Sequence, residues 1–166
     1  PSSLPIPDIL CQTFRMRNLT ATLCLTLAVL LGISGVSWGA DFQKGLDAAQ
    51  SGDFATALRE WKPLAEQGNA RAQYNLGVMY DNGKGVPQNY KTAVKWWRLA
   101  AEQGFASAQY NLGNMYDKGQ GVIQDNVYAH MWWNIAASSG DKYASKNRDI
   151  VAKRMTPSQL ETAQKL

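Results

Sequence analysis

Side chains that usually carry chemistry are scarce in this chain of 166 residues. It has two cysteines, Cys11 and Cys24, and a single histidine, His130. Both cysteines fall in an N-terminal segment with the features of an export signal, so the remainder has no thiol for a disulfide or a thiolate metal site. No cysteine and histidine spacing typical of a zinc site occurs, and no nucleophile motif. We therefore expect no catalytic residue, no metal and no cofactor.

An excess of charge of one sign is also missing. From residue 41 to residue 166 there are 15 basic and 12 acidic side chains, a net charge of +3. Lys91, Lys95 and Arg98 share one face of a predicted helix, and a solvated helix face is the simplest interpretation of them. Because the surplus is small and forms no long basic stripe, the sequence argues against nucleic acid as a partner.

The N-terminal 40 residues have the organisation of an export signal. Met16 and Arg17 precede an apolar run over 23–36, and small residues follow at Ser37, Gly39 and Ala40. Residues 16–40 have the length of a secretory signal peptide, with cleavage near Gly39 or Ala40. We expect a periplasmic or secreted protein without stable membrane insertion once this segment is cleaved.

Two further interpretations concern the same region. Residues 1–15 begin with Pro1 rather than Met, and we expect a disordered or non-native leader there. An uncleaved anchor is the alternative to the signal peptide, since residues 19–38 reach the roughly 20 residues that cross a bilayer. Polar and small residues interrupt that run, which favours cleavage.

A segment of 36 residues is present twice in tandem. Residues 69–104 and 105–140 are identical at 20 of 36 aligned positions. Repeats of this length are supersecondary units that bury their apolar faces only against neighbouring units. Each unit reads as helix, loop and helix, with a Gly-x-Gly loop at 83–88 and again at 119–124. The loop is not a phosphate loop, because no strand precedes it and no Gly-Lys-Ser/Thr follows.

Hydrophobic periodicity assigns a core face to the first helix of each unit. Over 70–82, Ala72, Leu76 and Met79 fall on one side, with Gly77 at its margin. A glycine costs helix stability about 1 kcal/mol relative to alanine. Its recurrence at Gly113 predicts a neighbouring helix pressed against the backbone there.

The second helix of each unit has a start signal and a stop signal at the same spacing. Asp53, Asn89 and Asp125 are good N-caps, 36 residues apart, and glycines at 68, 104 and 140 mark the ends. Trp97 falls on the buried arc, whereas Trp96 and Trp132 lie at its border. We expect these two to cover the joints between units.

The regions beside the two full units follow the same pattern in reduced form. Residues 41–68 read as a shortened unit that lacks the Gly-x-Gly loop, with Gly45 and Trp61 in the places of Gly77 and Trp97. Pro63 is expected to kink or shorten its second helix. Over 141–166, Asp141 starts one helix and the capping box at 156–159 starts another. Such a helix pair would cover the open end of the stack.

Four segments of the first full unit carry a family resemblance. They are Ala72-Gln73-Tyr74-Asn75-Leu76-Gly77-Val78-Met79-Tyr80, Gly83-Lys84-Gly85-Val86, Ala93-Val94-Lys95-Trp96-Trp97 and Ala100-Ala101-Glu102-Gln103-Gly104. These resemble the Sel-one-like repeat (SLR), a longer-looped relative of the tetratricopeptide repeat, over 69–104, over 105–140 and more weakly over 41–68. The segment 147–157 is also similar to the closing segment of small exported bacterial members.

The resemblance implies an all-α, right-handed α-solenoid of helix-loop-helix units with a C-terminal capping helix pair. It also implies that the protein is a scaffold or adaptor in protein complexes. Some exported bacterial members of the family act in this way at the cell envelope. Only two complete units are present, so a long concave groove is not expected.

A protein or peptide is accordingly the expected partner, bound through residues of the first helices that the helical wheel turns away from the core. These residues are Arg71, Tyr74, Asn75, Val78, Asp81, Asn82, Ser107, Tyr110, Asn111, Asn114, Asp117 and Lys118. The two asparagine amides, at 75 and 111, would hydrogen-bond a peptide backbone while the tyrosines hold its side chains. The alternative for the tyrosines is that they pack against the next helix.

Two other functions stay open at this point. One is an envelope hydrolase acting on wall or β-lactam-like substrates, although His130 reads as a buried or interfacial side chain. The other is a purely structural subunit that self-associates. We expect a monomer with no enzymatic activity.

Overall fold

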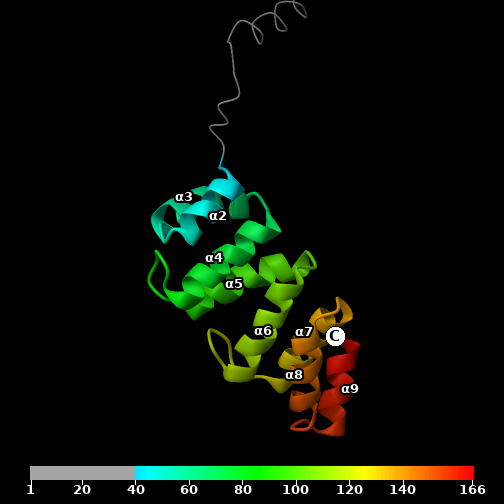
Figure 1. Ribbon diagram of the computed structural model, residues 1–166. Helices are drawn as coiled ribbons and strands as arrows, with labels where there is room; N and C mark the ends of the chain where they lie inside the picture. The colour runs from blue at the N-terminus through cyan, green and yellow to red at the C-terminus, as the bar shows by residue number, and fades with distance from the viewer. Residues whose placement is uncertain (1–39) are drawn as a thin grey trace, which may run out of the picture. The chain divides into compact units, whose positions relative to one another are not determined.

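The computed structural model describes residues 40–166, and this part of the chain is all-α without a strand (Figure 1). Its eight helices are α2 (Phe42–Gln50), α3 (Phe54–Glu66), α4 (Ala70–Asn82), α5 (Tyr90–Glu102), α6 (Ala106–Lys118), α7 (Asn126–Ser138), α8 (Lys142–Ala152) and α9 (Pro157–Lys165). From α2 to α8, each helix packs mainly on the helix before it and the helix after it, and α9 returns to pack on α7. This serial packing of helix pairs is an α-solenoid, as the sequence predicted.

The second helix of each unit begins at the cap that the sequence predicted. The side chain of Asp53 accepts from the backbone N–H of Thr56 at 3.0 Å, and Asn89 accepts in the same way from Thr92 at 3.0 Å. Asp125 accepts from the N–H of Val127 at 2.8 Å. Each cap satisfies an amide that has no partner inside the helix, a contribution of about 1 kcal/mol.

A tryptophan from the second helix lies against the glycine of the first helix in every unit. A Cβ atom built on Gly77 would lie 2.3 Å from Nε1 of Trp97, and Gly45 and Gly113 have the same relation to Trp61 and Trp133. Nε1 of Trp97 also donates to the carbonyl oxygen of Tyr74, at 3.1 Å. The predicted close approach is confirmed, and the indole ring is what makes it.

The two Gly-x-Gly loops reach back to the preceding unit. Their first glycines, Gly83 and Gly119, end α4 and α6 in the left-handed region, at φ 67° in both cases. Their second glycines lie on backbone: a Cβ on Gly121 would lie 2.5 Å from the carbonyl oxygen of Tyr90, at the start of α5. A Cβ on Gly85 would lie 2.6 Å from the Cβ of Phe54 and 3.0 Å from its carbonyl oxygen, at the start of α3. The second glycine therefore fixes the loop on the preceding unit.

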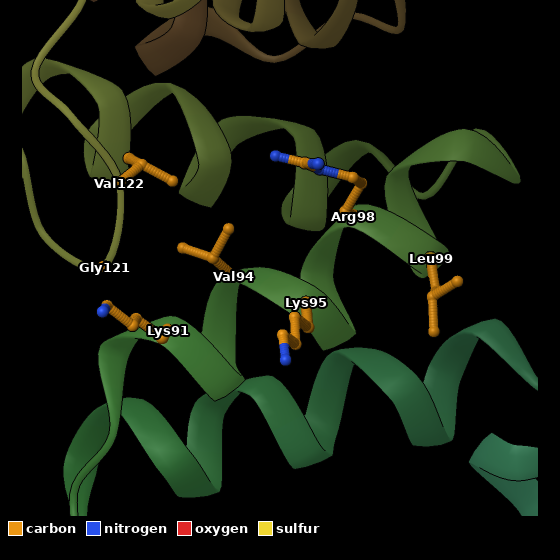
Figure 2. A pocket seen from close by; sticks show the side chains of 7 residues that line it. All are labelled: Lys91, Val94, Lys95, Arg98, Leu99, Gly121 and Val122. Atoms are coloured by element: carbon orange, nitrogen blue, oxygen red, sulfur yellow. The ribbon is translucent and has the colours of Figure 1, made fainter.

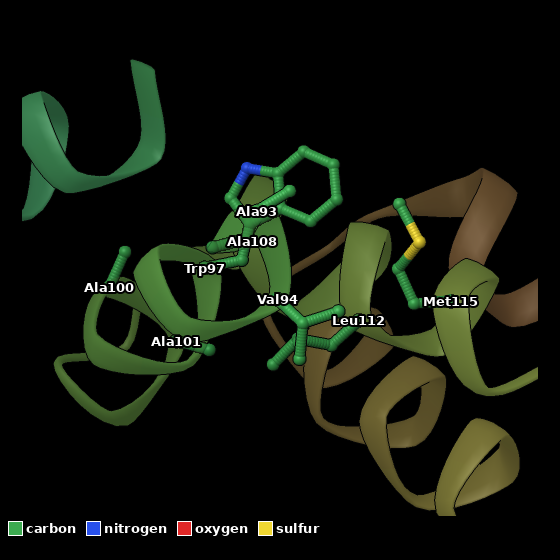
Figure 3. Close-up of a cluster of buried hydrophobic side chains, with 8 residues drawn as sticks. All are labelled: Ala93, Val94, Trp97, Ala100, Ala101, Ala108, Leu112 and Met115. Atoms are coloured by element: carbon green, nitrogen blue, oxygen red, sulfur yellow. The ribbon is translucent and has the colours of Figure 1, made fainter. Parts of the chain in front are cut away.

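The core is divided into one cluster for each joint between units. The central cluster lies between α5 and α6, and Figure 3 shows Val94 of α5 beside Leu112 of α6. Its buried members are Ala93, Val94, Trp97, Ala100, Ala101, Ala108, Leu112 and Met115. Trp132 packs on this cluster, and Trp96 packs on the preceding one. Both tryptophans thus cover joints, as predicted.

Buried glutamines connect three consecutive helices. Nε2 of Gln73 donates to the carbonyl oxygen of Ala65, and Oε1 of Gln73 accepts from Gln103 at 2.8 Å. In the next unit Gln109 donates to the carbonyl oxygen of Ala101, but its Oε1 has no partner. The reason is that Ser139, too short to reach, stands where Gln103 stands one unit earlier.

The predictions for α3, near the start of the described region, and for α8 and α9, at its end, have different outcomes. Pro63 was predicted to kink or shorten α3, and it does not shorten it, because α3 and α5 both have 13 residues. Pro63 lies in the last turn of α3, where it removes one amide donor without ending the helix. At the other end, the caps Asp141 and Thr156 start α8 and α9 as predicted, and the capping box at Thr156 is complete.

Candidate protein-binding surface

Four of the twelve predicted contact residues are exposed: Arg71, Asn82, Ser107 and Lys118. The other eight are half-buried, namely Tyr74, Asn75, Val78, Asp81, Tyr110, Asn111, Asn114 and Asp117. Of these eight, Tyr74, Val78 and Tyr110 pack against the core clusters. The helical wheel treats one helix in isolation, whereas the next unit covers part of the face that it assigns to solvent. As a binding set, the twelve remain a prediction.

The tyrosines pack between units. The ring of Tyr74 lies 5.0 Å from that of Phe105, centroid to centroid. Burial raises the pKa of the Tyr74 hydroxyl, and a hydrogen bond with the neighbouring Asn111 side chain opposes this shift. The hydroxyl of Tyr110 accepts from Asn147 of α8 at 3.3 Å. Packing against the next helix, the alternative considered above, is thus the arrangement of both side chains.

A hollow opens beside Asn75 and Val78. Its volume is about 210 Å³, and its lining residues are Ala49, Gln50, Phe54, Trp61, Asn75, Val78, Met79 and Lys84. The ammonium of Lys84 lies 5.4 Å from the centre of the Phe54 ring, a distance at which a cation and an aromatic face attract. Within residues 40–166 the amide of Asn75 makes no hydrogen bond. The hollow combines apolar walls with an amide and an ammonium group.

The repeated aspartates have different surroundings. Burial raises the pKa of Asp81, and the charge of Lys118 partly opposes this shift. Asp117 instead forms an ion pair with Arg154, which precedes α9. Asp117 therefore contacts the segment between α8 and α9.

His130 lies inside the stack at the joint between α7 and α8. It is 6% exposed, occupies the position of Val94 in the preceding unit, and its Nδ1 has no hydrogen-bond partner. Burial lowers its pKa, the nearby charge of Arg148 lowers it further, and Asp149 opposes both. The expectation of a buried or interfacial histidine is confirmed. In the described region no three histidine, cysteine or carboxylate side chains come together as a metal site would require.

The predicted signal peptide and leader lie outside the described residues, apart from Ala40. From residue 40 onward, no helix combines the length and the apolar character needed to cross a bilayer.

The geometry defines a class of protein: an α-solenoid of helix pairs in which a tryptophan of each second helix lies on a glycine of each first helix. Two matches to the Sel1 repeat fall on residues 70–105 and 106–141. The chain therefore contains two Sel1 repeats.

Solved structures agree with this assignment. The chain is similar to a protective antigen, c5321, present in uropathogenic Escherichia coli strains and displaying an SLR fold. The identity is 34% and the TM-score 0.70, over 72% of this chain and 27% of that one. A Sel1 repeat protein from Oxalobacter formigenes gives 34% identity and a TM-score of 0.63, over 65% of this chain and 44% of the other. The chain thus spans less than half of either protein. A comparison with curated proteins gave no match.

Sel1 repeats generally mediate protein–protein interaction, and proteins of this fold are typically non-catalytic scaffolds. Sequence reasoning left the packing of the tyrosines as an alternative, and it missed the hollow at Asn75. Both features depend on contacts between neighbouring units.

Proposed function

We propose that this protein is an exported scaffold that binds a peptide or protein partner at the first-helix face of α4 and α6, without catalysis of its own. The hollow at Asn75 carries the proposal. It offers apolar walls at Phe54 and Met79 for a side chain, and at Asn75 an amide that makes no hydrogen bond within residues 40–166 and could bind a peptide backbone. Proteins recognise extended peptide segments by hydrogen bonds to the peptide backbone and by pockets for its side chains.

The repeat supports the same proposal. Positions 71, 78 and 82 of the first full unit differ from 107, 114 and 118 of the second, although stacking residues such as Leu76 and Leu112 are kept. Variation on the surface of a repeat whose stacking residues are kept is what we expect of a surface adapted to a partner. Export to the periplasm or beyond the cell rests on the N-terminal sequence pattern alone.

The experiment compares the partners that the full chain and its variants capture from an envelope extract. Asn75→Ala removes the side-chain amide, and Val78→Asp places a charge at the edge of the hollow. Both should reduce capture of the same specific protein about tenfold or more, because a buried unpaired charge or a lost backbone hydrogen bond costs about 1–3 kcal/mol. Lys142→Ala, on exposed α8, is the control.

Circular dichroism must show that each variant keeps its helix content. Unchanged capture by folded Asn75→Ala and Val78→Asp variants would show that the partner binds elsewhere. Turnover of ester, amide or lactam substrates by the purified protein would contradict the non-catalytic part of the proposal.

A further inference from the structure

A second concave surface lies on α5 and the loop that follows α6. It is a cavity of about 460 Å³, within the range of ligand-binding clefts. Three cations, Lys91, Lys95 and Arg98, line it together with three apolar side chains, Val94, Leu99 and Val122 (Figure 2). We call these six residues the basic groove. It shares no residue with the hollow at Asn75, so it does not depend on the function proposed above.

The positive charge of the basic groove is not neutralised from within the described region. None of the ion pairs found in residues 40–166 includes Lys91, Lys95 or Arg98. Arg98 is instead held by a neutral group, because its guanidinium donates to the hydroxyl of Tyr116 at 3.0 Å. A neutral acceptor positions the guanidinium and leaves its charge available for a carboxylate.

Two apolar residues of the groove, Leu99 and Val122, are available to a partner for different reasons. Leu99 is 44% exposed, so its side chain is accessible to a partner. Val122 belongs to the loop whose Gly121 lies on the carbonyl of Tyr90, so one wall of the groove is fixed on the start of α5. The groove is therefore formed before any partner arrives.

The repeat does not require these cations. One unit later the positions of Lys91, Lys95 and Arg98 hold Val127, Met131 and Asn134, in a helix of the same length. The solenoid thus folds with either set. The cations of α5 need an explanation other than stacking.

The geometry points to an acidic, extended peptide segment with an aliphatic side chain as the occupant of the basic groove. Residues 91 and 98 are seven apart, about 10 Å along the helix at 1.5 Å per residue. Acidic side chains three residues apart in an extended segment with polyproline II geometry lie on one side and span about 9 Å, since that helix has three residues per turn and a rise of about 3.1 Å per residue. An aliphatic side chain between or beside them would reach Val94, Leu99 and Val122.

Other anions fit the groove less well. A nucleic acid would need a longer basic stripe and aromatic platforms for its bases, and the lining of the groove has no aromatic side chain. A lipid surface is flat on this scale, whereas the apolar side chains lie within a hollow. Those two ligands are outcomes that the experiment can separate.

The test uses the full chain and a fluorescein-labelled peptide, Gly-Glu-Leu-Ser-Glu-Leu-Gly, with a blocked C-terminus. Fluorescence anisotropy should show saturable binding that weakens as salt is added, because the attraction is electrostatic. A peptide with glutamine in place of both glutamates, and one with serine in place of both leucines, should each bind at least about tenfold more weakly.

Two charge reversals provide a matched comparison. Lys91→Glu with Lys95→Glu should weaken binding about tenfold or more. Lys142→Glu with Lys146→Glu makes the same change in net charge at an i, i+4 pair on exposed α8 and should change the affinity less than about twofold. Leu99→Ala should weaken binding about fivefold through lost apolar contact.

The inference is overturned if the peptide fails to bind at about 1 mM, or if both charge-reversed proteins bind it equally. It is also overturned if the chain binds single-stranded oligonucleotides or phosphatidylglycerol vesicles through Lys91 and Lys95 but not the peptide. Because Lys91 and Lys95 are exposed, their replacement should leave the thermal unfolding midpoint nearly unchanged, which separates loss of binding from loss of folding.

Discussion

The contact between Gly77 and Trp97 permits a quantitative prediction for Gly77→Ala. Alanine favours a helix over glycine by about 1 kcal/mol, so helix propensity alone would make the variant more stable. The structure predicts the opposite sign. The new Cβ would lie 2.3 Å from both Cδ1 and Nε1 of the indole, and a ring only 2% exposed has little room to move.

The magnitude follows from the contacts that must change. Overpacking of a core costs about 1–3 kcal/mol. Displacing the ring would also weaken the hydrogen bond from Nε1 to the Tyr74 carbonyl, a further loss of about 1 kcal/mol. After the gain in helix propensity is subtracted, we expect Gly77→Ala to destabilise the protein by about 1–3 kcal/mol.

Urea unfolding followed by circular dichroism at 25 °C measures this difference. The matched control is Gly77→Ala in a Trp97→Leu background, where no indole overlies the added methyl group. There the alanine should be neutral or stabilising, and the difference between the two backgrounds gives the free-energy cost of placing the methyl group against the indole. If Gly77→Ala stabilises the otherwise unchanged protein by about 1 kcal/mol, the indole does not exclude a side chain and this account of the repeat fails.

Two further predictions use one unit as a template for the other. Ser139→Gln should stabilise the protein by about 1 kcal/mol, because Ser139 has nearly the backbone angles of Gln103 and a glutamine there would reach the unpartnered Oε1 of Gln109. Equal stability of Ser139→Gln and the parent in urea would contradict this. His130→Val, which restores the residue of the preceding unit, should reduce the pH dependence of stability. The folded-state pKa of His130 is lowered from about 6.5, so the unfolded chain binds more protons below that pH and stability falls as the pH drops. Thermal melts from pH 7.5 to pH 5 should show a smaller decline for His130→Val, and an equal decline would assign the effect to other groups.

Much of this fold could be read directly from the sequence. The repeat length, the caps at Asp53, Asn89 and Asp125, and the paired glycines of the loops specify helix boundaries through interactions a few residues long. The recurrence of Gly77 at Gly113 also indicated a close approach to backbone. Such signals survive in a linear sequence because the groups that interact are near neighbours or occur at a fixed spacing.

The candidate binding surfaces were less predictable. The helical wheel placed Tyr74 and Tyr110 in solvent, yet Phe105 and Asn147 from later elements cover them. Lys91, Lys95 and Arg98 could be placed on one helix face, but the loop wall at Val122 comes from the next unit. A wheel describes one helix, and a surface between units depends on how two helices meet.

The sequence by itself determined that helix pairs stack and where each helix begins. Only the tertiary structure decided which half of each outer face stays accessible, and that a row of cations borders a hollow. The physical reason is the separation along the sequence of the groups that interact. Caps and turns are set by hydrogen bonds between residues close in sequence, whereas grooves form where side chains some thirty residues apart come into contact.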